Sequence, residues 1–232
     1  DMDKIMSLCK KYNVTLIEDA AESLGTLYKG KYTGTLGDYG IFSFNGNKII
    51  TTSGGGMLIS NDEERIQKVR FWSTQARDKA RHYQHSELGF HYRMSNVVAG
   101  IGRGQLKVLD QRVEKKRQIY NYYKDAFKDI KEIEFMPMNE WAYCNCWLTS
   151  IILKGKVTPL DIMIELEKEN IESRPLWKPM HLQPFFEKYD YIGNEISDNL
   201  FDTGLCLPSD SKMTKEQQDR VIDTIKRLFI NA

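Results

Sequence analysis

Short apolar runs alternate with stretches of helical spacing along this chain, and that alternation limits the folds it can adopt. Residues 2–12 have apolar side chains at helical spacing, and the apolar run 14–17 follows and leads into Glu18 and Asp19. Further strands are expected at residues 41–44 and 56–59. Helices that alternate with buried strands predict an α/β fold with a mostly parallel sheet in the first half.

The middle of the chain predicts a helix, a loop and a second helical stretch. Asn61 and Asp62 are suited to cap a helix over residues 63–72. Residues 73–90 are polar and show no sustained period, so they are expected to be mostly loop. A long helical pattern then begins at Ser95 and extends to about residue 127.

The second half is expected to form a smaller α+β unit. Its expected elements are strands around residue 133 and at 147–153, a helix at 158–169, a strand at 171–176 and two closing helices. We predict a boundary within the long helical pattern, with one domain over residues 1–112 and a smaller one over 113–232. The first strand has no preceding strand to join, so residues 1–112 are interpreted as the C-terminal part of a larger domain.

Charge and composition exclude several classes of function. The 33 Lys and Arg residues are balanced by 32 Asp and Glu residues, so the chain lacks the positive charge that displaces counterions from nucleic acid. It also has neither an apolar stretch of membrane-spanning length nor the layout of a signal peptide at its start. We therefore expect a cytoplasmic protein that binds neither nucleic acid nor membrane.

The cysteines indicate neither a zinc site nor a disulfide scaffold. The chain has four of them, Cys9, Cys144, Cys146 and Cys206, without the paired spacing of a zinc site and too few for a disulfide framework. Cys144 and Cys146 are expected to share one face of a strand.

Two short segments carry candidate chemistry. Asp19 follows a buried strand, where α/β sheets place their ligands. Ser43 and Lys48 lie on one tight connection before the glycine-rich turn 53–56, and a desolvated lysine amine is a nucleophile that forms Schiff bases. Taken alone, each residue has an ordinary explanation, because a strand-end Asp often caps a helix and a turn lysine is usually solvated.

The combination is more specific than its parts. Residues 18–23, 37–44, Lys48 and the glycine-rich turn resemble in order and spacing the sugar aminotransferases of the DegT/DnrJ/EryC1/StrS family. A weaker likeness at residues 88–95 and 178–184 extends the resemblance over essentially the whole chain. It implies the C-terminal part of a fold-type-I transferase that depends on pyridoxal 5'-phosphate. Within the family the sequence is most similar to enzymes that aminate UDP-linked 4-keto-6-deoxy N-acetyl sugars.

The resemblance also implies residue roles. Asp19 would pair with the pyridine nitrogen of the cofactor, Glu22 would reach its phenolic oxygen, and Ser43 would hydrogen-bond its phosphate. Lys48 would carry the cofactor as an aldimine, and its freed amine would move the proton between substrate carbon and cofactor. The implied reaction is ping-pong transfer of an amino group from L-glutamate to a nucleotide-linked keto-deoxy sugar. The related sugar dehydratases carry His in place of this lysine, so Lys48 favours amino transfer.

Further roles follow from the weaker likeness. His91 stands where many members have an Asn that reaches the phosphate in the neighbouring subunit, which implies a homodimer with active sites at the interface. Arg174, Lys178 and His181 lie in a loop that by resemblance borders the sugar nucleotide. The ordinary explanations are a partly buried histidine for His91 and surface residues without a ligand for the three loop residues.

Three further functions stay open at this point. The family's upstream Gly-Thr helix start and its aromatic residue that stacks on the cofactor have no counterpart before Asp1. The chain is therefore also interpretable as a truncated, non-catalytic remnant or partner subunit that binds cofactor poorly. A plain α/β interaction domain in which Lys48 is solvated fits the same residues, and so does a decarboxylase or lyase on the same fold.

Two patterns resemble sites but favour ordinary explanations. Gly100, Gly102 and Gly104 lie in a helical pattern without a preceding strand, which indicates close helix packing and not a dinucleotide loop. His82 and His85 would hold a metal ion only together with Glu87, and nothing else completes such a site. No metal is expected.

Overall fold

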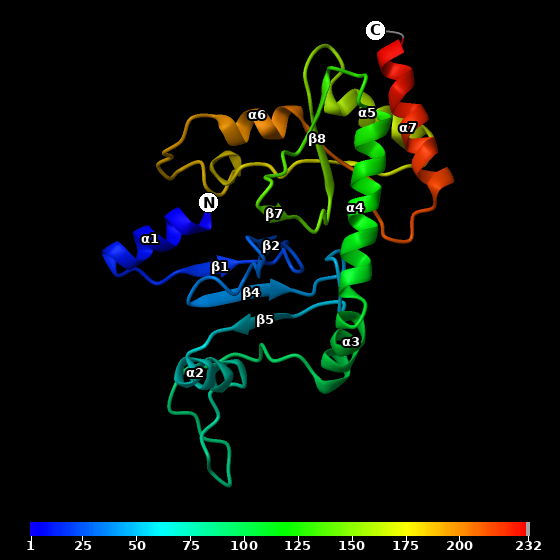
Figure 1. Ribbon diagram of the computed structural model, residues 1–232. Helices are drawn as coiled ribbons and strands as arrows, with labels where there is room; N and C mark the ends of the chain where they lie inside the picture. The colour runs from blue at the N-terminus through cyan, green and yellow to red at the C-terminus, as the bar shows by residue number, and fades with distance from the viewer. Residues whose placement is uncertain (231–232) are drawn as a thin grey trace. The chain divides into compact units, whose positions relative to one another are not determined.

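The computed structural model describes residues 1–230, which form two compact units (Figure 1). Unit 1 comprises residues 1–114 and the segment 139–147, and unit 2 comprises residues 115–138 and the described residues from Leu148 onward. The segment 139–147 thus belongs to unit 1, although the predicted boundary places it in the second domain. In the described part of the chain, no helix is long and apolar enough to span a bilayer.

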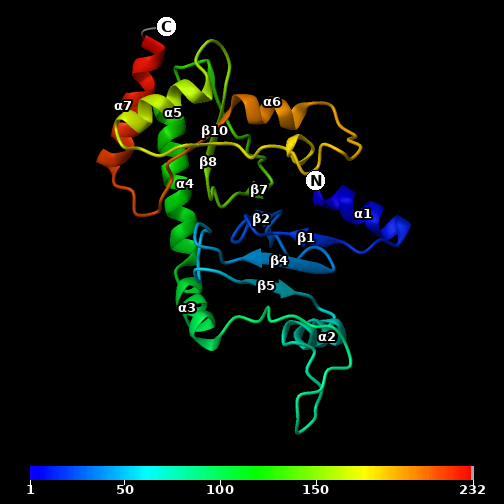
Figure 2. The same ribbon diagram turned by 180° about the vertical axis from the view of Figure 1, so that it is seen from behind.

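Unit 1 is built on a three-stranded sheet in the order β1-β4-β5. Strand β1 (Ile17–Asp19) pairs in parallel with β4 (Tyr39–Ser43), and β4 pairs antiparallel with β5 (Gly56–Ile59). The predicted α/β class is confirmed, with one parallel and one antiparallel pair in this sheet. Figure 2 shows α1 (Met2–Tyr12) leading into β1 and α2 (Glu63–Ser73) following β5.

The helices of unit 1 begin where side chains cap them. The Asp62 side chain accepts from the Arg65 amide at the start of α2, and Ser95 accepts from the Val98 amide at the start of α3 (Asn96–Leu106). The long helical pattern is two helices, because α3 ends at Leu106 and α4 begins at Leu109. Close packing explains Gly102, where an added Cβ would lie 3.0 Å from Thr52 Cγ2, but not Gly100 or Gly104, which have open space.

A small second sheet attaches the returning segment to unit 1. Its order is β3-β2-β7, with β2 (Leu27–Tyr28) at the centre between β3 (Lys31–Tyr32) and β7 (Ala142–Tyr143). The prediction that Cys144 and Cys146 share a strand face was wrong. Strand β7 ends at Tyr143. Cys146 has a left-handed φ of 49°, because the Asn145 side-chain oxygen accepts a hydrogen bond from the Trp147 amide and turns the chain.

Unit 2 is an antiparallel sheet with helices, as the α+β pattern predicted. The sheet order is β6-β8-β10-β9, formed by β6 (Ile133–Phe135), β8 (Thr149–Leu153), β9 (Arg174–Pro175) and β10 (Gly204–Leu207). Its helices are the later turns of α4 (Leu109–Ala126), then α5 (Pro159–Lys168), the short 3-10 helix η1 (Met180–Leu182), α6 (Ile196–Thr203) and α7 (Lys215–Ile230).

The core of unit 2 joins these helices to the sheet. Tyr123, Ile162, Leu166, Leu205 and Ile225 are completely buried there. Burying one such aliphatic side chain stabilises the fold by about 1.5–3 kcal/mol. Helix α5 also begins with a full capping box and a proline in its first turn, so its start is fixed locally as well.

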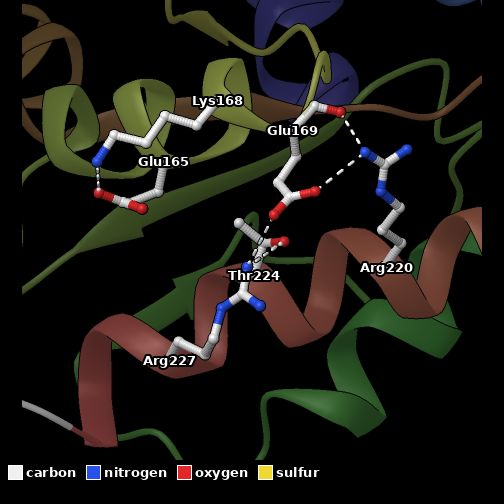
Figure 3. A network of polar contacts seen from close by, with 6 residues as sticks. All are labelled: Glu165, Lys168, Glu169, Arg220, Thr224 and Arg227. Atoms are coloured by element: carbon white, nitrogen blue, oxygen red, sulfur yellow. Dashed lines mark hydrogen bonds and ion pairs between the residues drawn. The ribbon is translucent and has the colours of Figure 1, made fainter.

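A polar network on the surface of unit 2 connects the end of α5 to α7 (Figure 3). The Glu169 carboxylate lies 3.0 Å from Arg220 Nη2 and 3.4 Å from Arg227 Nη2. The hydrogen bond from Arg220 holds the pKa of Glu169 below its ordinary value. The carboxylate thus bridges two turns of α7 from a single position at the C-terminus of α5.

Candidate active site

Two candidate residues end adjacent parallel strands. Asp19 is the last residue of β1, Ser43 is the last residue of β4, and the register pairs Asp19 with Ile41. Because β1 and β4 run in the same direction, both side chains lie at the carboxyl edge of the sheet, where α/β folds bind ligands. Asp19 is exposed and accepts a hydrogen bond from the Ala21 amide at 3.2 Å, and Ser43 accepts from the Asn45 amide at 3.4 Å.

Lys48 lies in the turn after β4 with its side chain only 13% exposed. Its ammonium is 3.1 Å from Glu22 Oε1 and 4.3 Å from the centre of the Trp147 ring. A carboxylate and an aromatic face are both favourable neighbours for a cation. A solvated turn lysine does not fit this enclosure.

The loops that carry Glu22 and Lys48 are held by the returning segment. The buried Asn145 side chain donates to the carbonyl oxygens of Glu22 and Leu24, both at 3.0 Å. The Trp147 indole N–H donates to the Asn47 carbonyl oxygen at 2.7 Å. Sequence reasoning missed both residues, although an Asn two residues before a tryptophan in an otherwise apolar stretch is the kind of buried polar group that needs partners.

Glu18, next to Asp19, has a structural position that the sequence analysis did not identify. Its carboxylate accepts hydrogen bonds from the amides of Gly34, Leu36 and Gly37 at 2.8, 2.5 and 2.6 Å. Successive side chains of a strand point to opposite faces of the sheet, so Glu18 and Asp19 cannot face the same side. Glu18 therefore shapes the loop that enters β4.

Steric overlap explains why the 37–44 motif has glycine at positions 37 and 40. A Cβ on Gly40 would lie 1.8 Å from the Gly34 carbonyl oxygen, and a Cβ on Gly37 would lie 2.8 Å from the Leu16 carbonyl oxygen. Gly34 itself has a φ of 82°, in the left-handed region that favours glycine. The loop and the first residues of β4 pack too closely for any side chain at positions 37 and 40.

His91 lies in another part of unit 1. It forms an isolated bridge with Thr74 and lines a shallow depression at the start of α3 together with Gln75, Arg93 and Ser95. The lining of this depression includes none of Asp19, Ser43 and Lys48. Its implied contact with a neighbouring subunit stays a prediction.

The three residues implied to border the sugar nucleotide are all in unit 2. Arg174 in β9 is exposed and paired with Glu172, with 2.6 Å between Arg174 Nε and Glu172 Oε1. Lys178 is exposed in the loop that follows. His181 in η1 is more enclosed, because its Nε2 lies 2.8 Å from Asp198 Oδ1 and its ring stacks on Tyr191 with 3.6 Å between centroids.

With this geometry in view, we compared the chain with known proteins. It matches the sequence model of the DegT/DnrJ/EryC1/StrS aminotransferase family over residues 1–226. The chain belongs to this family.

Individual members give the same result. The chain is 55% identical over 232 residues to the putative pyridoxal phosphate-dependent aminotransferase EpsN of Bacillus subtilis strain 168, covering 98% of this chain and 60% of EpsN. It is 34% identical over 229 residues to GDP-perosamine synthase of Escherichia coli O157:H7, covering 99% and 62% of the two chains. The chain spans about 60% of the length of the curated relatives it matches.

A solved structure supports the fold. Helicobacter pylori PseC, described as an aminotransferase involved in the biosynthesis of pseudoaminic acid, superposes with a TM-score of 0.93 at 20% identity. The match covers all of this chain and 64% of PseC. The predicted family and the fold-type-I class are confirmed.

The residues at the sheet edge fit the cofactor of the DegT/DnrJ/EryC1/StrS aminotransferases, pyridoxal phosphate. This molecule has an aldehyde, a ring nitrogen and a phosphate. Unit 1 offers a largely buried primary amine on Lys48, a carboxylate on Asp19 and a hydroxyl on Ser43. The amine can react with the aldehyde, the carboxylate can pair with the ring nitrogen, and the hydroxyl can donate to the phosphate.

The histidines of the loop before α3 are separately engaged. His82 Nε2 lies 3.3 Å from Gln84 Oε1, His85 Nδ1 lies 2.7 Å from the Gln75 carbonyl oxygen, and Glu87 accepts from Lys68 and from the Trp72 indole. Within residues 1–230, no cluster of His, Cys, Asp and Glu side chains has the geometry to hold a metal ion.

Proposed function

We propose that this chain is the part of a pyridoxal-phosphate-dependent sugar aminotransferase that bears the catalytic lysine. The observation that carries the proposal is the enclosure of the Lys48 ammonium between Glu22 and Trp147, in the turn that follows Ser43 at the end of β4. The proposed reaction transfers an amino group from L-glutamate to the keto group of a nucleotide-linked deoxy sugar. Family membership and the names of the relatives support the reaction class.

Each residue has a defined task in this proposal. When bound, the cofactor withdraws electrons from the substrate carbon that loses or gains the proton. The Asp19 carboxylate keeps a proton on the ring nitrogen, and the Ser43 hydroxyl donates to the phosphate. The Lys48 amine would hold the cofactor, and as a free amine it would accept and return the proton at the substrate carbon. Glu22 accepts a hydrogen bond from the free ammonium.

We propose a nucleotide-linked sugar as the substrate. GDP-perosamine synthase is named for a GDP-linked sugar, which supports a nucleotide-linked substrate. We propose that Arg174, Lys178 and His181 contact the nucleotide and that His91 acts across a homodimer. A cytoplasmic location stays a prediction.

Covalent trapping tests the proposal directly. The chain is mixed with pyridoxal phosphate, reduced with borohydride, digested and mapped by mass spectrometry. We expect one modified peptide, with the label on Lys48. Label on other lysines alone, or no label, would overturn the assignment and favour a remnant that does not bind cofactor.

A second measurement separates amino transfer from other reactions on the same fold. Adding L-glutamate to the loaded protein is expected to convert the cofactor to its amine form, which is followed by absorbance. Labelling of Lys48 without this conversion would favour a decarboxylase or lyase.

A further inference from the structure

The segment after β7 makes polar contacts with two separate loops of unit 1. Asn145 and Trp147 are 3% and 6% exposed, so both are buried although each carries a polar group. Asn145 contacts the loop of Glu22, and Trp147 contacts the turn of Lys48. These two loops carry the ion pair at the proposed active site.

All hydrogen-bonding groups of the Asn145 side chain are used. Its Nδ2 donates to the carbonyl oxygens of Glu22 and Leu24, and its Oδ1 accepts from the Trp147 amide at 3.0 Å. Its own amide donates to Thr26 Oγ1 at 3.1 Å. A buried amide with every partner in place has only one favourable orientation. Asn145 therefore fixes the main chain of residues 22–26.

Trp147 contacts two consecutive residues of the other loop with different parts of its indole. The ring N–H donates to the Asn47 carbonyl oxygen at 2.7 Å, and the ring face lies 4.3 Å from the Lys48 ammonium. A lysine ammonium sits on a flexible four-carbon stem and would otherwise sample many positions. The indole is rigid, so its two contacts fix the position of the Asn47 carbonyl group and the direction in which the Lys48 amine points.

We propose that Trp147 and Asn145 are positioning residues for Lys48. Trp147 holds the amine in the direction of the Glu22 carboxylate, and Asn145 holds the loop that brings this carboxylate within 3.1 Å. The inference rests on the proposed function, because a fixed amine matters only if it must meet a cofactor. It differs from a merely structural role in predicting a change at one amine and not only in overall stability.

Two substitutions separate the contacts of Trp147. Trp147→Phe keeps an aromatic face under the ammonium and removes the N–H donor, whereas Trp147→Leu removes both. The first readout is acetylation of the cofactor-free chain by a limiting amount of an activated acetyl ester, mapped by mass. The rate at Lys48 is divided by the rate at Lys124, an exposed residue of α4 in unit 2. This internal ratio corrects for reagent strength, and circular dichroism first establishes that each variant is folded, because unfolding would also expose Lys48.

The inference predicts an ordered series. Loss of the aromatic contact is expected to raise the Lys48 to Lys124 labelling ratio at least about threefold in Trp147→Leu, with Trp147→Phe closer to the unchanged chain. In the second readout, borohydride trapping of pyridoxal phosphate on Lys48 is expected to fall in the same order. Equal ratios and equal trapping in all three proteins would overturn the positioning role, even if the substitutions lower the melting temperature.

The two readouts also distinguish this inference from the proposed function. If the unchanged chain fails to trap pyridoxal phosphate but the labelling series holds, the proposed function fails and the control of the amine by Trp147 is upheld. If trapping is normal in the unchanged chain and in both variants, the function stands and the inference is wrong. Should Trp147→Leu fail to fold, judged by circular dichroism, Trp147→Met replaces it as the variant without an aromatic face, and the same series is expected.

Discussion

Glu22 and Lys48 are 26 residues apart in the sequence, and their side chains meet with 3.1 Å between Oε1 and Nζ. The two partners differ in environment, because the Lys48 side chain is 13% exposed and the Glu22 side chain is 52% exposed. The carboxylate can therefore exchange partners with solvent or a ligand while the amine stays enclosed. This asymmetry suits a lysine that must be held in place and then released.

Replacing Glu22 tests whether charge or hydrogen bonding matters in this pair. Glu22→Gln keeps an oxygen acceptor for the ammonium, whereas Glu22→Ala removes it. Because Glu22 is also proposed to reach the phenolic oxygen of the bound cofactor, a contact that Gln can keep, we expect pyridoxal phosphate affinity within about threefold of the unchanged chain for Gln and roughly fivefold weaker for Ala, the value of a net hydrogen bond of about 1 kcal/mol. Absorbance titration measures both. Equal loss in the two variants would mean that the negative charge is what matters.

Glu18 gives a second pair of substitutions, this time on stability. Its carboxylate accepts from three main-chain amides, and a glutamine in its place has only one acceptor oxygen and an NH₂ group facing donors. We expect Glu18→Gln to lower the free energy of unfolding by about 2 kcal/mol, because partly buried donors lose their acceptor. Urea denaturation measures it, with Glu64→Gln on the exposed face of α2 as the control that changes little.

Gly40→Ala should be far more disruptive than Gly46→Ala. The added Cβ at position 40 would lie 1.8 Å from the Gly34 carbonyl oxygen, whereas nothing lies within 4 Å at position 46. The β4 main chain must shift to relieve the overlap, so we expect a loss of about 3 kcal/mol or more at position 40 and less than about 1 kcal/mol at position 46. Thermal unfolding of the two variants checks this, and similar melting temperatures would contradict the close packing.

Much of this arrangement was predictable from local sequence. The strands β4 and β5 and the capped start of α2 follow from short apolar runs and from Asp62, all of which act within a few residues. Strand β1 lies at residues 17–19, at the end of the apolar run 14–17, and it is not the buried strand expected there, because Ile17 is 58% exposed. The placement of Asp19 and Ser43 at one sheet edge also follows from two adjacent parallel strands. Strand β9 is shorter than expected, covering only residues 174–175 at the sheet edge, where a proline is tolerated because its missing N–H is not needed.

The supporting residues of the site were not predictable, because their contacts join distant parts of the sequence. Asn145 is bonded to the Glu22 carbonyl across 123 residues, and Trp147 to the Asn47 carbonyl across 100 residues. No periodicity or cap rule reports such pairings. The strand pattern around Cys144 and Cys146 was misleading for the same reason, since a side-chain hydrogen bond and not strand pairing sets the backbone there.

The Glu169 network predicts a specific pH dependence (Figure 3). Arg220 lowers the pKa of Glu169 from its ordinary value of 4.5 in the folded protein. The contribution of the ionised Glu169 carboxylate to stability is therefore complete above pH 4.5 and is lost as the pH falls through the lower pKa of the folded state. We expect Glu169→Gln to lower the urea midpoint at pH 6 and to match the unchanged chain more closely at pH 3. Arg220→Gln should show the same pH dependence, and a constant difference at both pH values would contradict the linkage.

Lys48→Met separates the catalytic amine from the fold. Methionine keeps most of the apolar stem and removes the amine that lies over the Trp147 ring, and the carboxylate left behind is about half exposed and can be hydrated. We expect the free energy of unfolding to change by less than about 1 kcal/mol, as for other ion pairs open to solvent, while trapping of pyridoxal phosphate at this site disappears. Lys29→Met is the matched control, because Lys29 also pairs with a carboxylate, that of Asp3, but belongs to no proposed site. It should leave trapping on Lys48 unchanged. A large loss of stability in Lys48→Met with persistent trapping elsewhere would show that the enclosed lysine holds unit 1 together and does not serve chemistry.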